Sequence, residues 1–144
     1  MLRALVALAT LTVTLAPRQG FAAEVWLFCT GTQFITESFV SPQSVPAPPE
    51  TFFLDAKRGM VFSYNPRTRT LSQDGEAKFA SEAVTWSYQV KTNGGTVSGS
   101  FSLDRRTLHL SGSVQIPIPN GSVDKSYDED CSPTPPQPVQ GNRI

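Results

Sequence analysis

Apolar and polar residues alternate between Ala83 and Pro117 instead of recurring at helical spacing. A period of two places successive side chains on opposite faces, as in a β-strand with one buried face. We therefore predict a three-stranded antiparallel meander with an apolar inner face and an outer face rich in serine and threonine. Its apolar positions are Val84, Trp86, Tyr88 and Val90, then Val97, Gly99, Phe101 and Leu103, then Leu108, Leu110, Gly112, Val114 and Ile116.

Two turns set the register of this meander. Asn93-Gly94 is a strong signal for a two-residue hairpin loop, and Arg105-Arg106 is interpreted as the second loop. Both loops keep every apolar residue on one face, which a slip of one residue would break. The first loop pairs Val90 with Val97, Tyr88 with Gly99, Trp86 with Phe101 and Val84 with Leu103. The second pairs Leu103 with Leu108, Phe101 with Leu110, Gly99 with Gly112 and Val97 with Val114.

The first half of the chain carries shorter runs of the same kind, separated by frequent turn residues. The predicted strands are residues 25–30, 34–40, 51–54, 60–64, 68–72 and 76–79. Residues 41–49 contain four prolines and are predicted to form an extended surface loop. Turns at this frequency are typical of an all-β protein, so we expect a single antiparallel β-barrel or sandwich.

The N-terminus has the pattern of an export signal. Arg3 precedes a mostly apolar run over residues 4–15, and Gly20 and Ala22 supply small residues for cleavage before Ala23. The run is too short to span a bilayer, so we expect no membrane insertion after cleavage. We predict a signal peptide over residues 1–22, one all-β domain over 23–131 and a disordered Pro-rich tail over 132–144. The predicted location is periplasmic or secreted.

Charge and cysteine content narrow the class of protein. After residue 22 the chain has ten basic and twelve acidic residues, a formal charge of −2. This balance differs from the basic surface of a nucleic-acid-binding protein, so we expect no nucleic-acid partner. Cys29 and Cys131 are the two cysteines of the chain, and an oxidising compartment favours their pairing. We expect this disulfide to close the domain, with two buried free thiols as the alternative.

Residue types suited to catalysis or metal binding are few. The predicted register puts His109, the single histidine, beside Ser102 and near Asp104, which are the types of a nucleophile, base and carboxylate. Because no strand-turn-helix nucleophile motif accompanies them, we interpret this surface as a solvated sheet face and expect no enzyme. A late acidic cluster lacks the spacing of a calcium loop, so we expect neither metal nor cofactor. Its members are Asp124, Asp128, Glu129 and Asp130.

The inner face of the meander carries a ligand-binding hypothesis. In the predicted register Gly99 and Gly112 lie side by side, which leaves a dent with aromatic walls. The predicted pocket residues are Trp86, Tyr88, Gly99, Phe101, Leu110 and Gly112. The alternative is that the Tyr88 ring lies over the glycines and fills the core. The outer Ser/Thr-rich face offers a second, hydrogen-bonding surface that suits a sugar or a peptide.

Several short motifs resemble those of a group of small bacterial exported proteins without a known activity. The shared pattern is a Cys-x-Gly start, a Leu-Asp-Arg turn and a C-terminal cysteine, and it covers most of the mature chain. The resemblance implies a periplasmic or secreted location and no activity. A fainter similarity links the chain to disulfide-closed β-barrel inhibitors of lysozyme, but their inhibitory Ser-Gly loop has no counterpart here. The residues that carry the first resemblance are Phe28-Cys29-Thr30-Gly31, Leu54-Asp55, Gly59-Met60-Val61, Leu103-Asp104-Arg105 and Cys131.

We therefore expect an exported, non-catalytic binding or accessory protein whose partner is a small molecule or an envelope or extracellular protein. One alternative is an inhibitor of an extracellular hydrolase, in which residues 41–49 plug a cleft. Another is a hydrolase that uses Ser102, Asp104 and His109. A purely structural role in the cell envelope is the third. The sequence leaves the ligand, the partner and the oligomeric state open.

Overall fold

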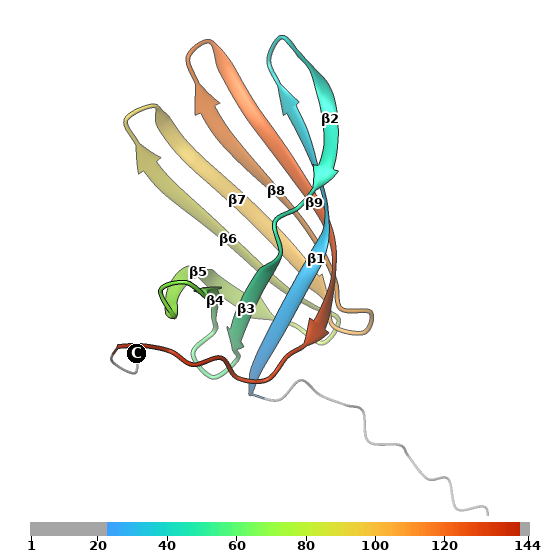
Figure 1. The fold of residues 1–144 in the computed structure, drawn as a ribbon, viewed down its shortest axis with the longest axis vertical. Helices are drawn as coiled ribbons and strands as arrows, with labels where there is room; N and C mark the ends of the chain where they lie inside the picture. Colours follow the sequence, from blue (N-terminus) through green and yellow to red (C-terminus); the bar gives the residue numbers. More distant parts are fainter. Residues whose placement is uncertain (1–22, 142–144) are drawn as a thin grey trace, which may run out of the picture.

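The computed structural model describes residues 23–141, and the regular structure in this range is β-strand throughout. The predicted signal peptide, residues 1–22, lies outside the described range. The all-β class is confirmed, and within the described range no helix is long and apolar enough to cross a membrane. The strands are β1 (Glu24–Glu37), β2 (Val40–Pro46), β3 (Glu50–Asp55), β4 (Met60–Asn65), β5 (Thr70–Phe79), β6 (Ala83–Thr92), β7 (Gly95–Asp104), β8 (His109–Ile118) and β9 (Gly121–Pro133) (Figure 1).

The sheet closes on itself as a barrel. Consecutive strands pair antiparallel from β3 to β9, and β1 pairs with both β3 and β9, so eight strands form a ring. The extra strand, β2, pairs with the second half of β1, beyond the part of β1 that pairs with β3. The barrel, one of the two predicted architectures, is therefore the observed one.

The predicted disulfide is present and joins the two strands that close the barrel. Cys29 on β1 and Cys131 on β9 are direct partners in the strand pairing, with Cα atoms 4.0 Å apart. Both cysteines are buried within the core. The crosslink spans 102 residues of sequence and so ties the first strand of the domain to the last.

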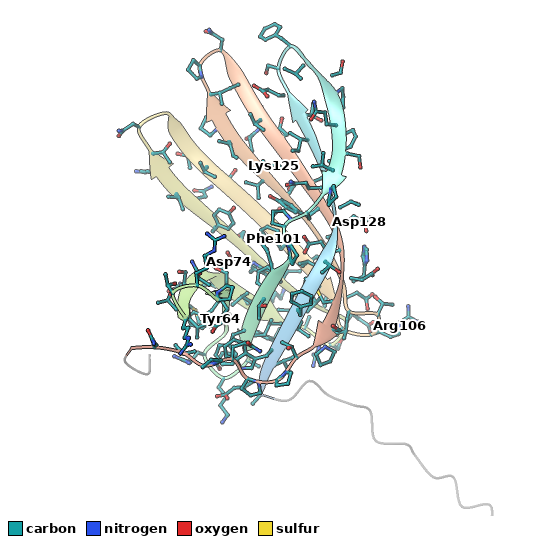
Figure 2. The ribbon with its side chains drawn as sticks, viewed as in Figure 1. Tyr64, Asp74, Phe101, Arg106, Lys125 and Asp128 are labelled. Carbon is teal, nitrogen blue, oxygen red and sulfur yellow. A yellow bond between two sulfur atoms is a disulfide. The ribbon has the colours of Figure 1, made fainter. Side chains whose placement is uncertain are left out.

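The barrel wall is lower on one side. β3 and β4 have six residues each, whereas β6, β7 and β8 have ten. β5 pairs with β6 only as far as Ser87, and β2 pairs only with β1, so among the described residues one edge of Tyr88–Thr92 and one edge of β2 lack a strand partner. The β1–β2, β6–β7 and β8–β9 hairpins splay apart at this end, while Arg106 marks a turn at the opposite end (Figures 1 and 2).

Inward-facing side chains are buried at one end of the barrel and exposed at the other. At the end near the Arg106 turn the core includes side chains that are at most 2% exposed: Leu27, Leu54, Val61, Val84, Leu103 and Leu110. Toward the hairpins, Val90 shares the inward parity of Val84 but is 52% exposed, and Val97 and Ile116 are half-buried. The interior is therefore filled at the first end and open to solvent at the second.

The predicted register of the β6–β7 hairpin is confirmed at every pair. Val84 pairs with Leu103, Trp86 with Phe101, Tyr88 with Gly99 and Val90 with Val97. The positive φ at this loop falls on Gly95, at 130°, a conformation that glycine adopts without a steric penalty.

The predicted register of the β7–β8 hairpin is wrong by two residues. Leu103 pairs with Leu110, Phe101 with Gly112 and Gly99 with Val114. A shift of two keeps the inward face inward, because the side-chain period of a strand is two. The dent formed by adjacent Gly99 and Gly112 is therefore absent, since these glycines are not direct partners.

The turn chemistry of Asp104 explains this shift. A two-residue loop needs positive φ at its centre, which arginine disfavours. Instead the Asp104 carboxylate accepts hydrogen bonds of 2.8 Å from the backbone N–H groups of Arg106 and Thr107. These bonds support a longer turn, in which the N–H of Leu108 donates to the carbonyl of Asp104 and Leu108 takes a φ of 59°.

Residues 41–49 differ from the predicted free loop. Most of the segment is β2, which pairs with β1, and Ala47 is buried and donates its N–H to the carbonyl of Gly31. β2 pairs with another strand along one edge only. A proline whose missing N–H falls on the free edge removes no hydrogen bond between strands, so prolines are tolerated here. These residues therefore do not form a free loop that could fill the cleft of a hydrolase.

The C-terminal tail also differs from the predicted disordered segment. β9 continues to Pro133, and residues 134–141 lie along the outer face of the barrel. The N–H of Thr134 donates to the carbonyl of Trp26, and the Tyr64 hydroxyl donates to the carbonyl of Pro138. Tyr64 belongs to an aromatic patch outside the barrel, formed by Trp26, Phe53, Phe62 and Tyr64.

Replacing Gly112 with alanine is expected to lower the free energy of unfolding by about 1 kcal/mol. A Cβ at this position would overlap the ring of Phe101, its direct strand partner, and the ring must shift to accommodate it. Urea unfolding measures the change. Gly94→Ala is the control, because the nearest atom to its new Cβ lies 3.7 Å away. Equal stability of both variants would contradict the observed β7–β8 register.

Candidate functional site

The structure separates the six predicted pocket residues into two groups. Trp86 and Leu110 belong to the buried core, at 4% and 1% exposure. Tyr88 and Phe101 are half-buried and face the open part of the interior. Each of these two rings leans over a glycine of the next strand: Tyr88 over Gly99, and Phe101 over Gly112. The predicted alternative, a ring that covers glycine, is thus the arrangement observed for Tyr88 and Gly99.

Aromatic rings line the wall made by β6 to β9. The centroid of Phe101 lies 5.4 Å from that of Trp86, 6.3 Å from that of Tyr88 and 5.9 Å from that of Tyr127. The first two pairs are near-parallel, with interplanar angles of 16° and 19°. Because Tyr88 and Phe101 lean over glycines, they lie along the wall instead of pointing across the barrel.

Three carboxyl groups from three strands influence one another electrostatically beside this wall, and we call them the carboxyl cluster: Glu50, Asp74 and Glu129. Glu50 on β3 is the direct partner of Cys29, and Glu129 on β9 has the same inward parity as Cys131. Asp74 lies at an irregularity in the β4–β5 pairing. Its carboxylate accepts a hydrogen bond of 2.5 Å from the indole N–H of Trp86, which links the carboxyl cluster to the aromatic wall.

Burial and neighbouring charge shift the pKa values of residues in and beside the carboxyl cluster. Burial, followed by the negative charges of Glu129 and Asp74, raises the pKa of Glu50 to about 7. Burial also raises the pKa of Asp74, although the hydrogen bond from Trp86 opposes this change. Burial, followed by the charges of Asp74 and Glu50, raises the pKa of Tyr88. Glu50 and Asp74 therefore hold their protons to a higher pH than free carboxyl groups do.

Glu129 is the most unusual member of the carboxyl cluster. Its side chain is 2% exposed, and neither carboxyl oxygen has a hydrogen-bond partner among the described residues. Burial raises its pKa. Most buried polar groups in proteins are hydrogen-bonded, so an unpaired carboxylate in this position is a candidate for ligand contact.

Sequence reasoning missed the carboxyl cluster because it grouped residues by charge and not by strand parity. Asp124, Asp128 and Asp130 alternate outward along β9, whereas Glu129 points inward. The signal was present: Glu129 is two residues from Cys131, whose disulfide requires an inward position. Glu50 and Asp74 carried no comparable signal, because their approach depends on the closure of the barrel.

The outer face holds a second, shallower site. The corrected register aligns four serines in one row across β6 to β9: Ser87, Ser100, Ser113 and Ser126. A groove of about 710 Å³ runs over Ser87, Ser100 and Ser113 of this row, and its lining includes Trp86, Phe101, Glu76 and Lys78. The hydroxyl oxygens of Ser100 and Ser113 are 3.4 Å apart. The groove offers serine hydroxyls and the side chains of Glu76 and Lys78, which are already accessible to water.

The structure does not bring the three predicted hydrolase residues together. Ser102 pairs with Ser111, and the carboxylate of Asp104 is occupied by the backbone of the following turn. The imidazole of His109 faces β9 instead, with Nδ1 3.2 Å from Asp130 Oδ1 and Nε2 3.5 Å from Asp128 Oδ1. The two-residue shift of β8 accounts for the difference.

Within residues 23–141, no group of three or more His, Cys, Asp or Glu side chains is arranged to hold a metal ion. The members of the late acidic cluster lie on two faces of β9, which separates Glu129 from the rest. Comparisons of the chain with protein-family models, with curated proteins and with solved structures found no match.

Proposed function

We propose that this protein is an exported, non-catalytic carrier or receptor of a small molecule, which binds in the open part of the barrel interior. The exposure of inward side chains carries the proposal: inward residues are buried at one end, whereas Val90 at the other is 52% exposed. Small-molecule sites are commonly lined by apolar and aromatic side chains with a few polar groups, and the solvent-exposed inward residues supply both kinds.

Two observations favour the interior over the outer groove. The interior combines aromatic surface with a buried carboxylate that lacks a partner, so a ligand there gains desolvation and the attraction of a nearby carboxyl group. The outer groove presents serine hydroxyls that are already hydrated, so a ligand exchanges one set of hydrogen bonds for another. A protein partner in the cell envelope remains the alternative.

Support for an exported location comes from the Cys29–Cys131 disulfide, since stable disulfides form mainly in oxidising compartments. The N-terminal sequence pattern supports the same location. Support for a non-catalytic role comes from the separation of Ser102, Asp104 and His109.

Filling the mouth of the barrel is expected to abolish binding of a neutral apolar probe. Val90→Trp adds a large side chain to an inward position near the hairpins, and Ser100→Trp adds the same side chain to the outer groove. The mature wild-type protein is titrated into N-phenyl-1-naphthylamine, whose fluorescence rises in apolar surroundings. We expect Val90→Trp to weaken binding at least tenfold and Ser100→Trp to change it less than twofold.

The same experiment has outcomes that would contradict the proposal. Loss of binding in Ser100→Trp alone would move the site to the outer groove and overturn the proposal. Failure of the wild-type protein to bind the probe would equally count against an apolar site in the interior. Circular dichroism of both variants separates altered binding from failure to fold.

A further inference from the structure

We propose that the carboxyl cluster selects an organic cation, such as a ligand with a substituted ammonium group, and holds it against the aromatic wall. This inference rests on the proposed function, because it names the chemical class of the ligand in the same interior. Three features carry it: the unpaired carboxylate of Glu129, the convergence of Glu50 and Asp74 near it, and the aromatic side chains beside them.

The first feature is a buried acceptor without a donor. Both carboxyl oxygens of Glu129 are inaccessible to solvent and lack a hydrogen-bond partner among the described residues. An isolated carboxylate in an apolar interior is strongly unfavourable unless a counter-charge accompanies it. The ion pair of Asp55 with Arg58 lies elsewhere, and His109 approaches Asp128 and Asp130 on the outward side of β9. A bound cation would supply the counter-charge.

The second feature is that the negative charge converges from three strands. Glu50 on β3 pairs with Cys29 of β1, and Glu129 on β9 pairs with Gly31 of the same strand. The charges of Glu129 and Asp74 both act on Glu50. Lys125 shares the inward face of β9 but lies four residues nearer the hairpins, roughly 13 Å along the strand. Figure 2 shows Lys125 nearer the hairpin end than Phe101.

The third feature distinguishes an organic cation from a bare metal ion. Tyr88, Phe101 and Tyr127 are half-buried and lie beside the carboxyl groups, whose charges act on both tyrosines. Aromatic faces attract ammonium and guanidinium groups within about 6 Å, and this attraction strengthens when water is excluded. The combination of carboxylates with ring faces therefore suits a cation that carries apolar substituents.

The test compares two probes of similar shape that differ in charge. Benzylamine and benzyl alcohol are titrated calorimetrically into the mature, oxidised protein at pH 8, where Glu50 is ionised. We expect wild-type protein to bind benzylamine at least tenfold more tightly than benzyl alcohol. Glu129→Gln keeps the shape of the side chain and removes its charge, so it should weaken benzylamine binding at least tenfold and leave benzyl alcohol binding within twofold.

A matched variant controls for net charge. Asp128→Asn removes the same charge from the neighbouring outward position on β9, so it should change benzylamine binding less than twofold. Equal affinity for the two probes, with no effect of Glu129→Gln, would overturn cation selection and leave an interior apolar site in place. Failure of both probes, together with failure of N-phenyl-1-naphthylamine, would overturn the proposed function itself. Displacement of benzylamine by micromolar calcium would assign the carboxyl cluster to a metal ion and overturn the inference.

Discussion

Replacing Cys29 and Cys131 with alanine is expected to lower the free energy of unfolding by about 4–5 kcal/mol. The disulfide closes a loop of 102 residues, so its loss frees a long segment of the unfolded chain. The entropy that the unfolded state gains grows with the length of that loop. Because a domain of this size has only about 5–15 kcal/mol of stability in total, the variant should be close to unfolding at physiological temperature.

Urea unfolding followed by tryptophan fluorescence measures this loss from the midpoint and slope of the transition. The oxidised wild-type protein is compared with the alanine variant and with wild-type protein in dithiothreitol. If the alanine variant and the reduced wild-type protein have the same free energy of unfolding, the loss comes from the missing crosslink and not from the packing of the sulfur atoms. A loss below about 1 kcal/mol in both would mean that the crosslink does not restrict the unfolded chain, contrary to the chain-entropy account.

Stability is expected to fall as the pH rises from about 4.5 to about 7. Below this range the carboxyl of Glu50 is protonated in both the folded and the unfolded chain. Within it, the unfolded chain has released the proton while the folded chain still holds it, because the pKa of Glu50 is raised to about 7. Each rise in pH therefore favours unfolding until the folded carboxyl has also ionised. The raised pKa values of Glu129 and Asp74 act in the same direction.

Glu129→Gln should remove part of this pH dependence and stabilise the protein by about 1–3 kcal/mol at pH 8, because it replaces an unpaired buried charge with a neutral group. At pH 4 both side chains are neutral, so the two proteins should have nearly equal stability. Thermal unfolding at a series of pH values measures the difference. Asp128→Asn is the matched control and should leave the pH profile unchanged. A destabilised Glu129→Gln variant at pH 8 would mean that the carboxylate has a stabilising partner.

Two groups outside the carboxyl cluster titrate in the opposite sense and in a lower pH range. Burial alone would raise the pKa of Asp55, but hydrogen bonds from Arg58 outweigh it and lower the pKa. Hydrogen bonds from the backbone of Thr107 and Arg106 lower the pKa of Asp104. Both carboxylates lose stabilising contacts only as the pH falls below about 4. A loss of stability as the pH rises above about 4.5 is therefore assigned to the carboxyl cluster.

Loops decided how much of the fold could be predicted from the sequence. Asn93-Gly94 admits few backbone conformations, so the β6–β7 register followed from it. The β7–β8 turn was predicted wrongly because the Asp104 side chain, and not the spacing of apolar residues, determines its length. Alternation alone cannot distinguish a barrel from a sandwich, since both bury one face of each strand.

The candidate site was harder to predict than the strands. The aromatic residues Trp86, Tyr88 and Phe101 were found because they alternate within one meander. Glu50, Asp74 and Glu129 come from strands that are distant in sequence, so their proximity follows from barrel closure and from the irregularity at Asp74. Only the position of Glu129, two residues before Cys131, was accessible from local spacing.

The pairing of β1 with β9 also imposes an order on folding. β1 is synthesised first, yet its longest pairing is with the last strand, over residues about 100 positions away. Contacts between such distant residues slow folding, because the intervening chain must be ordered before they form. Until β9 arrives, Leu27 and the other apolar side chains of β1 remain exposed to aggregation. Assembly of this domain therefore has a late, obligatory final step, and a nascent chain that ends before β9 (Gly121–Pro133) is unable to complete it.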